Sequence, residues 1–333
     1  MPLRSNRGCV KLQIEQMAKL PKDPTGRTGW PWAEGCVPLP GQMEDGRQWP
    51  RISVVTPSYN QGRFIEQTIR SVLLQGYPDL EYLVVDGGST DGSVEVIRRY
   101  EKSLAWWVSE PDRGQSHAIN KGFARATGEI LAWLNSDDYY LPGVLATVAR
   151  AWRDSNRPAA LVGRGMSVTE DGVPIHTSPA KELTFDAIVW WCDRCLFQSS
   201  CFFPAQAYRA VGGVDEQLHY AMDMNLWLKL IKVVPFRHVD GVLSAAHRHS
   251  DMKTYDMSRQ FFLEMVQVQI RHGRPDVALA AVGQLYDRYE YCRSEWDRIV
   301  RRLRPLVNNP IYRALRPLLR RRRAGTGPQE KAT

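Results

Sequence analysis

Short apolar runs alternate with segments of helical spacing between Arg51 and Leu134. The apolar runs are rich in β-branched and aromatic residues, which predicts strands, and the segments between them show helical spacing of apolar residues. Because strands joined through helices run in the same direction, this order predicts an α/β fold with a mostly parallel open sheet flanked by helices. The predicted strands are 52–56, 81–86, 105–109 and 130–134, and the predicted helices are 64–74, 94–100 and 116–126.

Polar turns follow the first three predicted strands, at 57–62, 87–92 and 110–114. Ligands of open α/β sheets bind outside the carboxyl ends of the strands, so we expect a ligand site along this edge. The first turn has neither the GxGxxG fingerprint of dinucleotide-binding proteins nor a P-loop, and the chain has no GxSxG elbow. These nucleotide-binding and hydrolase classes are therefore not expected.

The fourth predicted strand runs directly into Asn-Ser-Asp-Asp at 135–138. Two adjacent carboxylates repel each other, and partial burial increases the cost. A divalent cation would relieve it, since Mg²⁺ and Mn²⁺ bind one or two carboxylates together with substrate phosphates. On this stretch alone an alternative stays open, in which Ser136 or Asp137 caps a helix that begins near Leu141.

The composition of the chain is that of a globular protein. The chain has 333 residues, 43% of them hydrophobic, which supports a packed core. It contains neither an apolar run of membrane-spanning length nor an N-terminal signal-like segment, so we expect a cytoplasmic protein, or one peripheral at the inner face of a membrane. Cys192 and Cys195 have the CxxC spacing without a second pair, which favours reduced thiols over a zinc site.

The net charge of +8 is concentrated near the carboxyl terminus. Residues 298–323 contain ten arginines and no acid, so the remainder of the chain carries about −2 once ten is subtracted from +8. Apolar residues lie among these arginines, which favours an amphipathic segment that binds an anionic membrane surface. A nucleic-acid site and a solvated tail are the alternatives, and we do not expect a nucleic-acid partner.

The predicted organisation has three parts. Residues 1–50 are rich in Pro and Gly and predict a loop-rich extension, 51–255 form the main α/β domain, and 256–333 form a helical extension with an Arg-rich tail. Within the middle part we expect a hairpin of 161–168 and 174–177. The predicted helices of the last part are 257–272, 276–291 and 294–303. The middle part also contains a cluster of aromatic residues, for which core packing is one interpretation: Trp190, Trp191, Phe197, Phe202 and Phe203.

Five motifs in this order resemble the family 2 glycosyltransferases, inverting enzymes with the GT-A fold. The motifs are Thr-Pro-Ser-Tyr-Asn at 56–60, Val-Asp-Gly-Gly-Ser-Thr-Asp-Gly at 85–92, Asp112-x-Gly114 with Asn120-x-Gly122, Asn-Ser-Asp-Asp at 135–138, and Gly-Gly-Val-Asp-Glu at 212–216 before Met-Asp-Met-Asn-Leu-Trp-Leu at 222–228. The resemblance covers about residues 51–255. It implies that 51–255 form the catalytic domain, with a nucleotide-sugar half at 51–140 and an acceptor half at 141–255. In the acceptor half, the aromatic cluster at 190–203 is either an acceptor platform or part of the core.

The resemblance also implies an activity. Such an enzyme, hexosyltransferase-like, moves a sugar from a nucleoside-diphosphate sugar, with uridine the expected base, to a glycan or lipid-linked glycan acceptor. A role in building a bacterial-type polysaccharide of the cell envelope follows. In this family the acid that ends the second strand holds the base, which corresponds to Asp86. The residues expected at the nucleotide sugar are Thr56, Pro57, Tyr59, Asn60, Asp86, Gly88, Asp112, Gln115, Asn120 and Ser136.

A metal site is implied as well. The family's DXD-type motif corresponds to 135–137, where this chain has Asn135 in place of the usual Asp, so the site carries one negative charge fewer. Asp137 is the expected ligand of Mn²⁺ or Mg²⁺, with Asp138 as a second. His249, in a segment that resembles the family's closing motif, is the third candidate, against a structural role for a lone histidine.

Asp223 corresponds to the family's general base. An inverting transfer needs a carboxylate that removes the acceptor proton while the nucleoside diphosphate leaves from the opposite face. The alternative is that Asp223 caps a helix over 224–233. At the level of the whole chain, a nucleotidyltransferase on a related sheet and a non-catalytic binding protein that uses the basic tail are the other hypotheses.

Overall fold

The computed structural model describes residues 15, 17–21, 26–154, 158–180, 183–190, 196–253 and 259–307. The chain divides into two compact units, residues 1–274 and 275–333. Cys192, Cys195, Trp191 and most of the Arg-rich tail lie outside the described residues, so the predictions made for them are not addressed by the structure. The larger unit contains the sheet and α9, and the smaller unit contains α10.

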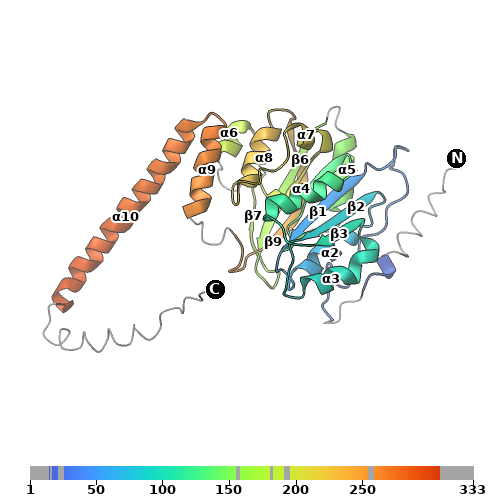
Figure 1. Cartoon of the computed structure of the whole chain (residues 1–333), viewed down its shortest axis with the longest axis horizontal. Helices are drawn as coiled ribbons and strands as arrows, with labels where there is room; N and C mark the ends of the chain where they lie inside the picture. Colours follow the sequence, from blue (N-terminus) through green and yellow to red (C-terminus); the bar gives the residue numbers. More distant parts are fainter. Residues whose placement is uncertain are drawn as a thin grey trace. The chain divides into compact units, whose positions relative to one another are not determined.

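The amino-terminal half of the sheet is parallel, as the sequence predicts. Its strands lie in the order β3-β2-β1-β4, and the turns that follow them therefore open at the same edge (Figure 1). The strands are β1 (Ile52–Ser58), β2 (Leu80–Asp86), β3 (Trp106–Ser109) and β4 (Ile130–Trp133), and the helices between them are α2 (Ile65–Leu73), α3 (Ser93–Tyr100) and α4 (Gln115–Arg125).

The second half of the sheet is mixed. Beyond β4 the order continues β8-β6-β9-β5, in which β6 and β9 are parallel and the other neighbours are antiparallel. The predicted hairpin is confirmed, because β7 pairs antiparallel with β6. The strands are β5 (Asp138–Tyr140), β6 (Ala160–Val168), β7 (Pro174–Thr177), β8 (Cys201–Pro204) and β9 (Phe236–His247), and the helices are α5 (Val144–Arg153), α6 (Phe185–Trp190), α7 (Ala205–Ala210), α8 (Met222–Leu230) and α9 (Arg259–Arg271).

Strand β5 decides between the two interpretations of the Asn-Ser-Asp-Asp stretch. Asp138 opens this strand and pairs with Ala246 of β9. The next helix, α5, begins only at Val144 behind Gly143, and no side chain caps it. The helix-cap interpretation of Ser136 and Asp137 is therefore wrong, because the chain continues as a strand.

The core lies on both faces of the sheet. Ile52 and Val54 of β1 belong to one buried cluster with residues of α2, α3 and α5, whereas Val55 faces α4. A Cβ at Gly122 of α4 would come within 2.5 Å of Val55, so the helix lies against the strand only because this residue is glycine. Phe202 and Phe203 of β8 are fully buried, so both belong to the core.

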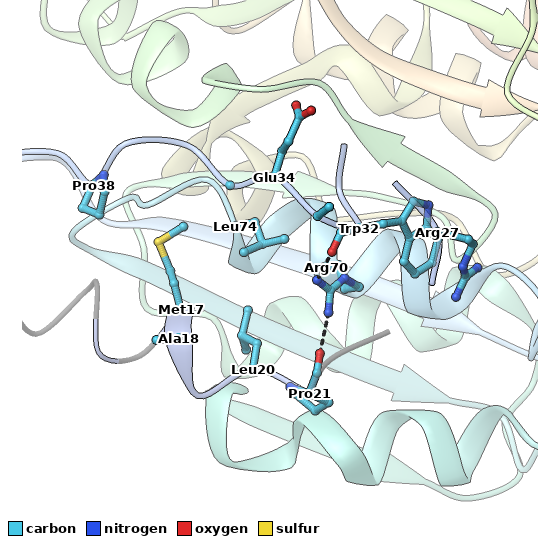
Figure 2. Close-up of a pocket in the computed structure, with 12 residues that line it drawn as sticks. Met17, Ala18, Leu20, Pro21, Arg27, Trp32, Glu34, Pro38, Arg70 and Leu74 are labelled. Carbon is cyan, nitrogen blue, oxygen red and sulfur yellow. Dashed lines mark hydrogen bonds between the residues drawn. The ribbon is translucent and has the colours of Figure 1, made fainter. Parts of the chain in front are cut away.

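The amino-terminal segment packs onto α2 through polar contacts. The buried guanidinium of Arg70 donates to the carbonyl oxygens of Pro21 and Trp32 (Figure 2). It also donates to the carbonyl oxygen of Pro31. These contacts border a pocket of about 560 Å³ that Met17, Leu20, Arg27 and Leu74 also line. None of its lining residues belongs to the predicted site.

Helix α10 (Pro275–Val307) is one continuous helix of 33 residues. The prediction of two helices, 276–291 and 294–303, was wrong at this point. Cys292 and Arg293, which separate the predicted helices, do not break a helix, and the apolar spacing continues across them. Among the described residues, no helix is both long enough and apolar enough to cross a membrane.

Candidate active site

The end of β2 is held by a buried carboxylate. Asp86 is fully buried, and its two oxygens accept four hydrogen bonds, from Gly88 N (3.1 Å), Ser89 N (2.9 Å), Ser89 Oγ (2.6 Å) and Ser109 Oγ (2.7 Å). Two of these donors are backbone groups of the turn after β2, and one comes from β3. Asp86 thereby fixes the turn that contains Gly88 and ties it to the neighbouring strand.

A second carboxylate lies beside that turn. Asp112 accepts one hydrogen bond within the described residues, from Gly114 N to Oδ1 at 2.7 Å. Its Oδ2 is 2.9 Å from where a Cβ of residue 87 would lie, and the Tyr59 ring is 3.3 Å from the same point. Gly87 therefore leaves room between Asp112 and Tyr59, and the Tyr59 side chain is 63% exposed. An aromatic ring and a carboxylate oxygen next to a bare backbone form a surface suited to a nucleobase.

The turns after β1 and β2 are joined to each other. Asn60 has a left-handed backbone (φ 51°), receives a hydrogen bond from Thr90 N on its Oδ1 and donates its own N–H to Ser89 Oγ. The side chain of Asp91 accepts a hydrogen bond from Gly62 N at 2.8 Å. Thr56 and Pro57 are buried, and the Thr56 hydroxyl contacts Tyr82 at 3.0 Å, so these two residues support the turn from inside.

The loop after β4 is linked to α4 and to the segment after β9. Lys253 Nζ donates to Gln115 Oε1 (2.9 Å), and Gln115 Nε2 donates to Asn135 Oδ1 (2.7 Å). Asn135 Nδ2 in turn donates to Gln198 Oε1 at 3.1 Å. Although part of its side chain is open to solvent, desolvation of its ammonium group lowers the pKa of Lys253, and the charges of Glu264, Asp112 and Asp137 oppose this shift. Lys253 thus lies between the carboxylates of the two turns.

Asp137 is paired with a buried histidine. Its Oδ2 lies 3.1 Å from His249 Nε2, and its carbonyl oxygen contacts His247 Nδ1 at 2.8 Å. Arg63 Nη2 lies 3.3 Å from the other nitrogen of His249, and Phe64 packs against both imidazoles. A carboxylate oxygen and an imidazole nitrogen are both possible ligand atoms of Mg²⁺ or Mn²⁺. The distance between these two atoms is similar to that between adjacent ligands of one ion.

Asp138 lies in a different environment from Asp137. Its side chain is buried at the start of β5, with hydrogen bonds from Asn135 and Ser199. Burial first, and then the charge of Asp137, raise the pKa of Asp138 well above its ordinary range. The described residues contain no group of three or more His, Cys, Asp and Glu side chains able to hold a metal.

Asp223 occupies the first turn of α8, where its Oδ1 accepts Met224 N at 2.7 Å. The residue at the cap position is Ala221, so the proposed capping role does not apply. Desolvation raises the pKa of Asp223 to about 6, against the opposing effect of the Met224 N–H. The start of α8 contacts the start of α4, since Ser116 Oγ lies 2.8 Å from Met222 Sδ. The same turn of α4 carries Gln115, which donates to Asn135, so the start of α8 lies near the loop after β4.

One predicted nucleotide-sugar residue, Asn120, is engaged elsewhere. The Asn120 side chain donates to Val214 O and Glu216 Oε1 and accepts from Tyr208 OH and Val214 N, so it joins α4 to the loop before α8. Ser136 is buried. Conversely, the sequence analysis assigned no role to Ser109, Arg63 or Lys253. Lys253 belongs to the segment that resembles the family's closing motif, so only that one could have been inferred from the sequence.

The sheet and the helices around it have the GT-A type of fold. The structure is similar to the crystal structure of S. aureus TarS (residues 1–349) in complex with UDP-GlcNAc, with a TM-score of 0.55 at 20% identity over 66% of each chain. At this identity the likeness concerns the fold.

Sequence comparison identifies the family. The model of glycosyl transferase family 2 matches residues 53–206. An uncharacterized glycosyltransferase of Mycobacterium tuberculosis is 33% identical over 186 residues, which cover 54% of this chain and 68% of that protein. A putative teichuronic acid biosynthesis glycosyltransferase of Bacillus subtilis is 33% identical over 142 residues, covering 41% of this chain and 56% of that protein. The chain belongs to glycosyltransferase family 2.

Proposed function

We propose that this enzyme transfers a sugar from a uridine-diphosphate donor to a glycan or lipid-linked glycan acceptor with inversion, and that Asp223 is the general base. The observation that carries the proposal is the placement of Asp223, whose partly desolvated carboxylate has a pKa of about 6. A base works best when its pKa lies near the working pH. Through Ser116 and Met222, its helix contacts the first turn of α4, where Gln115 donates to Asn135 of the loop after β4.

The nucleoside lies, in this proposal, on the surface formed by Tyr59, Gly87 and Asp112. Uracil presents an imide N–H that a carboxylate oxygen accepts, and its face stacks on an aromatic ring. Asp112 Oδ2 borders this surface, whereas both oxygens of Asp86 already accept donors of the protein. Asp86 then acts indirectly, by holding the turn at 87–89 in place.

Asp112→Asn and Asp86→Asn are expected to separate these two roles. Asp112→Asn should weaken UDP binding roughly tenfold to a hundredfold, the effect of losing one charge-assisted hydrogen bond, with little change in thermal stability. Asp86→Asn places an amide N–H₂ among four donors and should lower the free energy of unfolding by about 1–3 kcal/mol. Titration calorimetry with UDP and thermal unfolding measure the two effects. Unchanged UDP binding in Asp112→Asn would show that Asp112 does not contact the base.

We propose Asp137 and His249 as the protein ligands of Mn²⁺ or Mg²⁺. Such an ion supplies positive charge to the leaving diphosphate. Two protein ligands suffice because these ions retain waters and bind substrate phosphates. The His249 side chain must then present an unprotonated Nε2, so the contact of Arg63 with Nδ1 changes when the ion binds. Asp138 is omitted from this ligand set because burial favours its protonated form.

The activity should follow the ionisation of Asp223. The reactive form is the carboxylate, and because its pKa is raised to about 6, that form is lost as the pH falls through 6. We expect kcat/KM to reach a plateau above this pH and to be roughly tenfold lower at pH 5. An acidic limb near pH 4, the range of an ordinary Asp, would contradict the assignment.

A panel of nucleotide sugars tests the function itself. Purified enzyme with Mn²⁺ and no acceptor is expected to release nucleoside diphosphate slowly from one donor, and addition of EDTA should abolish the release. The donor that is hydrolysed identifies the sugar and the base that the enzyme uses. Absence of both turnover and metal-dependent nucleotide binding with every donor would overturn the proposal and favour a non-catalytic protein.

A further inference from the structure

Helix α10 carries an exposed apolar stripe that follows a heptad repeat. Leu279, Val282, Tyr286, Tyr289 and Trp296 lie at alternating spacings of three, four, three and seven residues, which are the a and d positions of a coiled coil. Four of these side chains are between 58% and 72% exposed, and Val282 is 45% exposed. The sequence continues the repeat with Val300 and Leu303. A stripe that persists over more than three heptads favours another helix as its partner.

We propose that α10 pairs with α10 of a second copy of this chain as an antiparallel coiled coil. This goes beyond the proposed activity and does not depend on it. Tyrosine and tryptophan side chains bury roughly 150–250 Å² each, so the three aromatic residues from each of two helices give an interface on the order of 1,000 Å². That is the area expected for a specific interface.

The charges of the helix favour the antiparallel orientation. Residues 275–290 contain three acids and one arginine, a net charge of −2, whereas residues 291–307 contain five arginines and two acids, a net charge of +3. Antiparallel pairing places each acidic half beside a basic half and also opposes the two helix dipoles. Parallel pairing places like charges together. Both signs are present along α10, with a net charge of only +1, so an anionic bilayer attracts it weakly.

Full overlap of the two helices sets one register. Residue 275 then lies opposite residue 307 of the second copy, and Tyr286 lies opposite Trp296. Tyr289 lies opposite Arg293, so the guanidinium of Arg293 comes to the aromatic ring of Tyr289. Arg293 is the one charged residue at a core position and pairs with Glu290 of its own helix at 3.6 Å. A single polar core residue restricts the register of a coiled coil. In this register the two Cys292 residues, which are exposed, meet near the two-fold axis.

The oligomeric state tests the interface. Light scattering after gel filtration of the full chain is expected to give a dimer for the wild type and a monomer for Tyr286→Glu. Tyr291→Glu is the matched control, since Tyr291 is 66% exposed but lies on the opposite side of the helix from the stripe. A monomeric wild type, or equal loss of the dimer in both variants, overturns the proposal. If the wild type is a monomer, it should also be sedimented with anionic phosphatidylserine vesicles. Binding to these vesicles that is lost in Tyr286→Glu would show that the apolar stripe of α10 binds a membrane instead of a second copy.

Crosslinking tests the orientation. A short bismaleimide is expected to join two wild-type chains through Cys292, and Cys292→Ser should abolish this product. Leu279→Cys in the Cys292→Ser background should not crosslink, because antiparallel overlap separates the two positions by about 36 Å, the length of 24 helical residues. Efficient crosslinking through residue 279, with none through residue 292, would show a parallel pair and overturn the antiparallel assignment.

Discussion

Asp223→Asn is expected to lower the rate of sugar transfer by about 10²–10⁴-fold, the usual contribution of a general base. The amide has nearly the same shape as the carboxylate but cannot take up the proton of the acceptor hydroxyl. The loss should appear mainly in kcat, because the base acts on the acceptor hydroxyl during the transfer step itself. The acidic limb of the pH profile, which follows the pKa of about 6, should disappear with it.

A second acid serves as the control for this substitution. Asp186→Asn removes an exposed carboxylate that pairs with Arg274 and lies at the start of α6. We expect its transfer rate to stay within about twofold of the wild type, as for most surface substitutions. Steady-state kinetics with the identified donor and circular dichroism of both variants are the measurements. Wild-type kcat in Asp223→Asn, in a folded protein, would exclude this residue as the base.

Asp137→Asn is expected to lower Mn²⁺-dependent donor hydrolysis by at least about 100-fold, the scale found when one group that stabilises developing charge is removed. The substitution replaces a charged ligand by a neutral one at a site where Asn135 already stands in place of the family's usual Asp. The affinity for Mn²⁺ in the presence of UDP, measured by electron paramagnetic resonance of the free ion, should fall in parallel.

The adjacent acid provides a matched comparison. Asp138→Asn should keep most of the Mn²⁺ affinity and activity, because an amide resembles the protonated carboxyl group that burial favours at this position. Equal losses in Asp137→Asn and Asp138→Asn would mean that both carboxylates bind the ion, as the sequence alone suggested. Retention in Asp137→Asn with loss in Asp138→Asn would reverse the assignment.

Local pattern was sufficient for the amino-terminal half of the sheet. The strands and helices between Ile52 and Trp133 were predicted within one or two residues, because apolar periodicity and turn residues are properties of neighbouring positions. Strand β5 was not predicted. It has only three residues, and its pairing with β9 depends on residues more than a hundred positions away. The continuity of α10 was missed because Cys292 and Arg293 interrupt an apolar pattern without breaking a helix.

The sequence by itself determined the family, the parallel half of the sheet and the order of the acidic turns along its edge. The tertiary structure decided what each acid faces. Asp86 ends one strand and Asp112 follows another, yet only Asp86 is surrounded by donors from the turn after β2 and from the neighbouring strand β3. Asp137 and Asp138 are adjacent, yet one meets His249 and the other is buried beside Ser199. Asp137 lies in the turn before β5 and Asp138 begins that strand, so the two side chains meet different neighbours. Those neighbours, which are distant in sequence, set the charge that each carboxyl group can carry.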